Sequence, residues 1–241
     1  MKNYIYIILS LTISLSAFGQ KNLTVNYSVE TSGDFFQKEE NDLDDLDKKI
    51  NEGIKNHISD FKFTLKINET ESLFESVKTM SNDHNSFGYK ITQSVIQSKK
   101  KFYANINTRE SLTETESYGQ KFIIVDTLRT SKDWVIGNET KKIGDYQCIK
   151  ATTKKTVINT EGEFITDIVV WFAPEISFSF GPLGYGGLPG LILELQDDIF
   201  VYKVNELNYV ENLKIKKPNS GKKVTKKEFL EIGLKAIENR F

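Results

Sequence analysis

Three acidic residues beside a glycine-rich stretch are the first candidates for chemistry in this sequence. Glu194, Asp197 and Asp198 follow the segment from Gly181 to Gly190, where a carboxylate could serve a bound ligand as a general acid or base. A metal-assisted hydrolase would combine them with His84 of a polar loop. A structural role explains these acids better, because Asp197-Asp198 has the composition of a hairpin turn and Glu194 alternates with leucines.

Recognised catalytic and metal-binding motifs are missing from the sequence. It contains no H-E-x-x-H, C-x-x-C or G-x-S-x-G pattern, and neither His57 nor His84 has a second ligand at a known metal spacing. Cys148 is the only cysteine and lies in an alternating apolar run, which predicts a buried, inert thiol. We therefore expect no catalytic residue, no metal and no cofactor.

The glycine-rich stretch reads GPLGYGGLPGLILEL from Gly181 to Leu195. Its spacing does not match a phosphate-binding loop, because Pro189 occupies a required glycine position and Gly187 stands where a Walker loop needs lysine. We expect a tight backbone passage that leads into a strand. The loop residues are Gly181, Pro182, Gly184, Gly186, Gly187, Pro189 and Gly190, and the expected ligand or partner contacts are Trp171, Phe178, Tyr185 and Leu188.

The N-terminal residues have the pattern of a secretory signal peptide. Lys2 precedes an apolar run from Tyr4 to Leu15, and Ala17-Phe18-Gly19 supplies small residues for cleavage before Gln20. This predicts a signal peptide over residues 1–19, a single domain over residues 20–241, and no transmembrane anchor after cleavage. The expected location is periplasmic or secreted.

Charge gives little indication of the partner. The formal net charge is −1, which offers no electrostatic case for nucleic acid. Lysines gather between Lys214 and Lys227; they could meet anionic lipid or an acidic partner, but a solvated loop and the first turn of a helix explain them better.

Period-two alternation predicts that most of the chain forms strands. Apolar residues at helical spacing between Gln37 and Ile58, and a capping box at Thr225–Glu228, predict one early helix and one C-terminal helix. The short connections favour antiparallel pairing. The expected strands are Leu23–Tyr27, Phe61–Ile67, Leu73–Val77, Ile91–Ile96, Lys101–Asn107, Ser111–Glu116, Lys121–Leu128, Gln147–Ile158, Glu163–Phe172, Leu191–Leu195 and Ile199–Val204.

Several motifs in a fixed order resemble the GLPGLI family of Bacteroidota. They are Trp134-Val-Ile, Glu139–Ala151, Trp171–Ile176, Gly181-Pro and Gly187-Leu-Pro-Gly-Leu-Ile192. The resemblance implies an exported protein, often encoded beside TonB-dependent outer-membrane receptors, and it implies no established activity or catalytic residues.

The order of elements is similar to that of LolA/LolB-like folds, a likeness of fold only. We expect a mainly β protein with two helices, its antiparallel sheet curled into an incomplete barrel around helix; an antiparallel β-sandwich with peripheral helices is the alternative.

The expected function is a non-catalytic periplasmic binding or accessory protein associated with TonB-dependent uptake. The alternatives are an apolar-ligand or lipid carrier of LolA/LolB type, a metal-assisted envelope hydrolase, and a structural partner of an outer-membrane receptor. Its partner would be that receptor or a small apolar or peptide ligand.

Overall fold

A computed structural model describes residues 22–39, 42–77, 85–159 and 162–238. The predicted signal peptide at residues 1–19, its cleavage position before Gln20, and His84 lie outside the described residues. None of the helices in the described ranges is long and apolar enough to cross a membrane.

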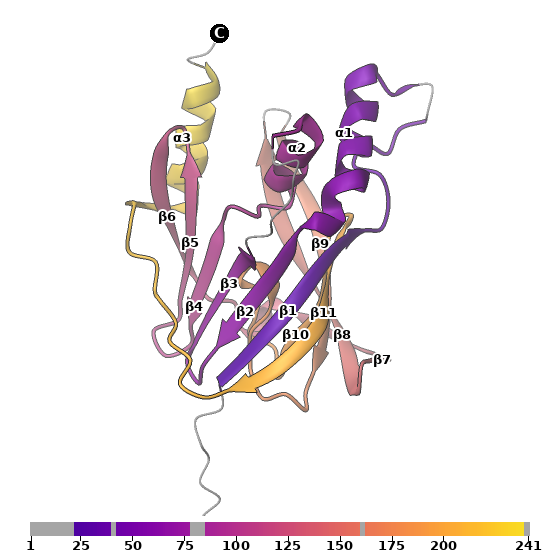
Figure 1. The fold of residues 1–241 in the computed structure, drawn as a ribbon. Helices are drawn as coiled ribbons and strands as arrows, with labels where there is room; N and C mark the ends of the chain where they lie inside the picture. Colours follow the sequence, from indigo (N-terminus) through magenta and orange to yellow (C-terminus); the bar gives the residue numbers. More distant parts are fainter. Residues whose placement is uncertain (1–21, 40–41, 78–84, 160–161, 239–241) are drawn as a thin grey trace, which may run out of the picture.

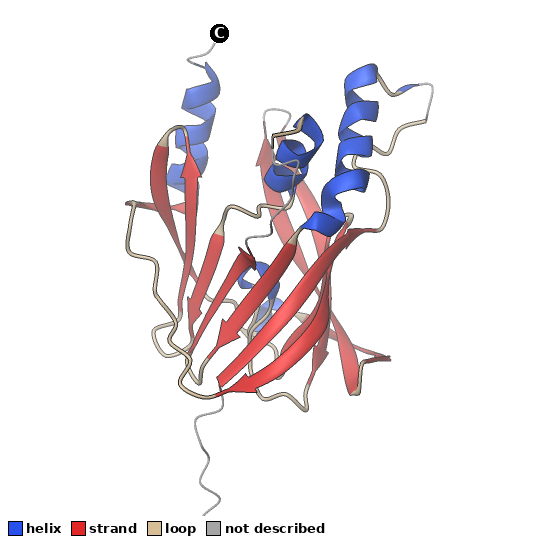
Figure 2. Ribbon diagram, in the orientation of Figure 1, coloured by secondary structure: helices blue, strands red, loops and turns tan. Residues whose placement is uncertain are grey.

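One mixed sheet organises the described residues, and three α-helices accompany it (Figures 1 and 2). The strand order is β12-β6-β5-β4-β3-β2-β1-β11-β10-β9-β8-β7. The strands are β1 (Asn22–Thr31), β2 (Lys62–Ile67), β3 (Glu71–Val77), β4 (Lys101–Asn105), β5 (Glu110–Ser117), β6 (Gln120–Thr127), β7 (Val135–Ile143), β8 (Tyr146–Asn159), β9 (Gly162–Ala173), β10 (Leu191–Asp197), β11 (Phe200–Val210) and β12 (Lys222–Thr225).

The prediction of a mainly β protein is confirmed, but the sheet is not wholly antiparallel. β12 pairs with β6 in parallel, whereas the other neighbouring strands are antiparallel. The sheet curls without closing into a barrel, because β12 and β7 remain its two ends. The described strands form one sheet, so the β-sandwich alternative is wrong.

The long hairpins follow the sequence pattern. β8 and β9 pair from Ile149↔Phe172 out to Asn159↔Gly162, and β10 and β11 are joined across a turn in which Asp198 has a φ of 57°. An aspartate tolerates this left-handed conformation better than most residues. The predicted hairpins at both places are confirmed.

The two predicted helices are confirmed with changed bounds. The early helix, α1 (Asp45–His57), begins later than Gln37 because Asp44 accepts a hydrogen bond of 2.7 Å from the Asp47 backbone N–H and caps it there. In α3 (Lys226–Glu238) the predicted capping box is present: Thr225 N–H donates to Glu228 and Glu228 N–H donates to the Thr225 hydroxyl.

A third helix, α2 (Phe87–Val95), replaces the strand predicted at Ile91–Ile96. Ser86 caps it by accepting a hydrogen bond from Tyr89 N–H at 3.1 Å. Its backbone packs closely on α1, because a Cβ added to Gly53 would lie 2.7 Å from Gly88 Cα. The β-branched residues in Ile91–Ile96 favour a strand, but the packing of this segment against α1 favours a helix, and the packing decides the structure.

Two clusters of buried residues hold the sheet together. The larger cluster includes residues from β1, β2, β8, β9, β10 and β11, and α1 and α2 contribute Ile54 and Tyr89 to it. A smaller cluster joins β3, β4, β5 and β6 through Leu73, Tyr103, Leu112 and Ile123. The curled sheet therefore leaves two walls, β4–β6 with α3 on one side and β8–β10 on the other, to frame a cleft.

Candidate functional site

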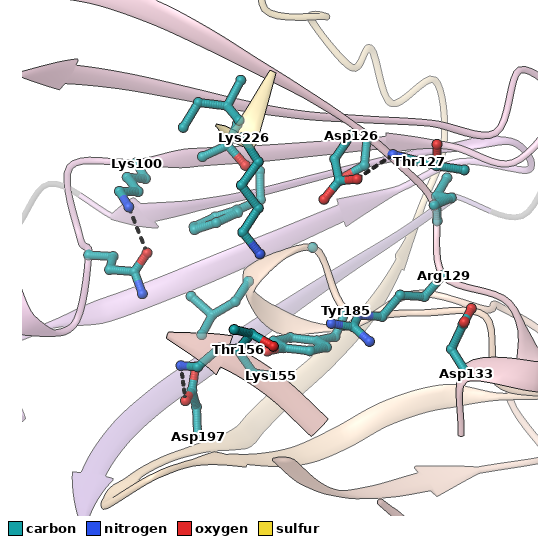
Figure 3. Close-up of a pocket in the computed structure, with 18 of the residues that line it drawn as sticks. Lys100, Asp126, Thr127, Arg129, Asp133, Lys155, Thr156, Tyr185, Asp197 and Lys226 are labelled. Carbon is teal, nitrogen blue, oxygen red and sulfur yellow. Dashed lines mark hydrogen bonds and ion pairs between the residues drawn. The ribbon is translucent and has the colours of Figure 1, made fainter. Parts of the chain in front are cut away.

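A cleft of about 750 Å³ lies between these two walls, and we call it the cationic cleft. Its charged lining residues come from separate elements (Figure 3). The basic residues are Lys100, Arg109, Arg129, Lys155 and Lys226, and the acidic residues are Asp126, Asp133 and Asp197. In Figure 3 the Lys226 side chain extends from the start of α3 into the cleft.

The glycine-rich loop forms part of the cleft wall. The short 3₁₀ turn η4 (Pro182–Gly184) places Leu183, Gly184 and Tyr185 at the cavity. Trp134 supports the loop from behind, since its indole N–H donates to the Gly186 carbonyl at 2.9 Å. The loop is thus a structural passage whose first part also lines the cleft.

Close approach of backbone to backbone explains why glycine occurs so often here. Gly187 has a φ of +85°, and a Cβ there would lie 2.4 Å from the Arg129 carbonyl oxygen. A Cβ on Gly190 would lie 2.3 Å from the Ala173 carbonyl oxygen, and its φ is +158°. Both positions therefore require glycine.

Arg129 stands beside this loop with its guanidinium in the cleft. The guanidinium lies 5.2 Å from the centre of the Tyr185 ring and donates to the Thr153 hydroxyl at 3.3 Å. Stacking on an aromatic face leaves the edge of a guanidinium free to bind oxygen atoms in pairs. Arg129 is therefore held in place by Tyr185 and Thr153, without an ion-pair partner among the described residues.

Lys155 and Asp197 form the ion pair at the other end of the cleft. Their side chains are 25% and 10% exposed, so the pair is shielded from water. Lys100, nearby, donates to the Gln97 side chain at 2.9 Å. Burial lowers the pKa of Lys100, and the positive charge of Lys155 lowers it further.

The charges in the cleft are not balanced. Within the described residues, Lys100, Arg109, Arg129 and Lys226 have no ion-pair partner. The carboxylate of Asp133 accepts hydrogen bonds from the backbone N–H and the hydroxyl of Thr130, which lower its pKa, and the nearby charges of Arg129 and Arg109 lower it further. Outside the Lys155–Asp197 pair, four basic side chains therefore face two carboxylates, Asp126 and Asp133. The cleft therefore suits an anion.

The predicted contact residues do not gather at one place. Tyr185 lines the cationic cleft, whereas Trp171 is partly buried against the larger core cluster, with the Lys141 ammonium 4.5 Å from its ring centre. Phe178 packs against the larger core cluster. Leu188 is 1% exposed and belongs to that cluster.

The predicted group of carboxylates is divided between the two faces of β10. Glu194 is paired in register with Trp171 and binds Lys141 at 2.7 Å, whereas Asp197 is paired with Ile168 on the core face and binds Lys155. Asp198 lies in the following turn. The described residues hold no group of three His, Cys, Asp or Glu side chains that could bind a metal.

A serine, a histidine and an aspartate meet at the helices, and sequence spacing did not indicate this. The His57 ring lies 3.0 Å from Asp60 through Nδ1 and 3.3 Å from the Ser86 hydroxyl through Nε2. Ser86 also caps α2, and none of the three lines the cationic cleft. The arrangement ties the end of α1 to the start of α2.

Cys148 is buried, as the alternating pattern predicted. Burial raises the pKa of its thiol to about 11, so the sulfur is protonated and unreactive at neutral pH.

Comparisons with known proteins give a short family match and a fold likeness. Residues 159–194 match a family described as a protein of unknown function (Porph_ging). A crystal structure of PNGF-II superimposes with a TM-score of 0.54 at 14% identity, covering 88% of this chain and 32% of that one. The chain therefore spans about a third of that protein's length, and the likeness concerns the fold alone. No match was found among curated proteins.

Proposed function

We propose that this protein is a non-catalytic binding or accessory protein of the cell envelope, and that it binds an anionic ligand in the cationic cleft. One observation carries the proposal: four basic side chains line a cavity of about 750 Å³ without an ion-pair partner among the described residues. Preformed cavities with a few convergent polar groups are the usual form of ligand sites.

The envelope location rests on the signal-peptide pattern and on the resemblance to an exported family. Association with a TonB-dependent receptor rests on the same resemblance. The curled sheet with helices at its mouth supports a carrier of the LolA/LolB kind in architecture, but the charged lining disfavours a ligand that is wholly apolar.

The first prediction uses tripolyphosphate as a multivalent anionic probe in isothermal titration calorimetry. Replacing Arg129 and Lys226 together by glutamine removes two charges from the cleft, and we expect affinity to fall at least about tenfold, since hydrogen bonds to charged groups contribute about 1.5–3 kcal/mol each. Binding at low ionic strength should also weaken as salt is added.

The matched control replaces Lys48 and Lys49 on the exposed surface of α1 by glutamine. This variant has the same net charge as the cleft variant. Equal loss of affinity in both variants, or no binding by the unaltered protein, would contradict an anion site in the cleft.

A further inference from the structure

A second cavity of about 700 Å³ adjoins the cationic cleft. The two cavities share Gln97, Lys155, Val157, Leu183 and Asp197 in their walls. Because they share this boundary, one bound molecule can occupy both. We call the second cavity the apolar arm.

Apolar side chains dominate the part of the arm that the cationic cleft does not share. Phe164 of β9 is 45% exposed, and Phe35, which follows β1, is 37% exposed. Phe200, Val95 and Tyr202 also line this part, with the Phe35 and Phe200 rings 6.3 Å apart, and its polar members are Thr166 and Asp198. Partly exposed aromatic side chains at a cavity indicate a surface that binds apolar groups.

The Lys155–Asp197 ion pair separates the two chemical environments. On one side lie basic groups without ion-pair partners among the described residues, including Arg129 and Lys226, and on the other side lie aromatic rings. A small inorganic anion would leave the apolar arm solvated, and a neutral apolar molecule would leave the basic groups without a counter-charge. A ligand with both an anionic group and an apolar group would pair with the basic side chains and also fill the apolar arm.

We infer that the ligand is an anionic amphiphile. Its phosphate or carboxylate head would lie in the cationic cleft between Arg129 and Lys226, and its hydrocarbon chain would lie in the apolar arm against Phe35 and Phe164. This inference rests on the proposed function, because the head group uses the same basic side chains.

The test measures affinity against chain length. Butyl, hexyl and octyl phosphate are titrated below their micelle concentrations, and burial of each further methylene should tighten binding by up to about fourfold. We expect octyl phosphate to bind at least about tenfold more tightly than butyl phosphate, because several methylenes separate the two chains. Octanoate and butyrate repeat the comparison with a carboxylate head, and a dependence in either series supports the inference and identifies the head group.

Two variants show whether the apolar arm receives the chain. Replacing Phe35 and Phe164 together by serine should abolish the dependence on chain length while tripolyphosphate binding stays unchanged. Both side chains are partly exposed, so the variant is expected to fold. Ile165→Ser is the control, because Ile165 is 66% exposed on the opposite face of the same strand.

The outcomes separate this inference from the proposed function. If tripolyphosphate binds but chain length has no effect, the amphiphile is wrong and the anion site stands. If no anion binds, the proposed function fails as well. Equal binding of octyl phosphate and octyl glucoside, or an equal loss in Ile165→Ser, would also overturn the inference, because the head group or the arm would then have no specific role.

Discussion

Arg129 connects the glycine-rich loop to the cationic cleft through both its backbone and its side chain. Its carbonyl oxygen fills the space that a side chain on Gly187 would need, and its guanidinium stacks on Tyr185 of the same loop. A change in the loop backbone therefore moves a group that would bind the ligand. The loop affects binding without itself being the anion site.

The sequence alone does not identify which basic residues line the cleft. Lys100 and Arg129 each lie at a strand end, and Lys226 begins a helix, so they are far apart along the chain. Only the curl of the sheet brings them together. The visible lysine cluster between Lys214 and Lys227 contributes Lys226 alone to the cleft.

Lys100 should make anion binding depend on pH. Its pKa is lowered by burial and by Lys155, so in the free protein it loses its proton at a lower pH than an ordinary lysine. Affinity for sulfate, an anion whose own charge is constant between pH 7 and 10, should therefore fall as the pH rises over this range, because the anion binds the protonated form. Asp197, which is paired with Lys155, is the acidic side chain that faces these lysines.

Substitution at Lys100 checks this assignment by calorimetry across the same pH range. Lys100→Arg should flatten the decline, since a guanidinium stays charged, whereas Lys226→Arg should leave it unchanged. A decline that persists in Lys100→Arg would assign the proton to another group.

Among the elements, the predictable ones are those whose local pattern decides the structure. The hairpins at β8–β9 and β10–β11 and the cap of α3 depend on neighbouring residues, and the sequence predicts them correctly. β7 was not predicted because most of its residues are exposed, so no alternation marks it. β12 is short and pairs in parallel with a strand far away along the chain.

The tight passage at Gly187 leads to a prediction for the loop. Gly187→Val places a branched side chain at positive φ against the Arg129 carbonyl, and we expect the free energy of unfolding to fall by about 3 kcal/mol or more. Urea denaturation measures this loss, and folding yield should drop with it.

Gly119→Val is the matched control for this substitution. Gly119 also has a positive φ, +71°, but nothing lies within 4 Å of its Cβ position. We expect a loss of only about 1–2 kcal/mol, which isolates the cost of the backbone conformation. If Gly187→Val is no more destabilising than Gly119→Val, or folds normally and loses only ligand binding, the structural role of the loop is wrong.

At the scale of the whole molecule, one sheet connects the two walls of the cleft. The larger cluster extends from Phe74 and Ala104 on one side to Ala151 and Phe172 on the other. The described residues should therefore unfold as one cooperative unit, consistent with the single domain expected from the sequence.

Two spectroscopic signals test this cooperativity. Trp134 and Trp171 both lie on the β7–β9 side, so their fluorescence reports that wall, whereas far-ultraviolet circular dichroism reports the whole sheet. We expect the two urea transitions to coincide. A later or earlier transition seen only by circular dichroism would mean that β4–β6 and α3 unfold separately.

The two ends of the sheet have a consequence for solubility. Each end has backbone groups that another chain could pair with, and such edges act as templates for aggregation. β12 carries the exposed Lys222 and Lys223 there, and β7 is interrupted by a register shift between Ile136 and Thr140 and carries Lys141 and Lys142. Charge and irregular backbone thus oppose edge-to-edge association of the open sheet with further copies of the chain.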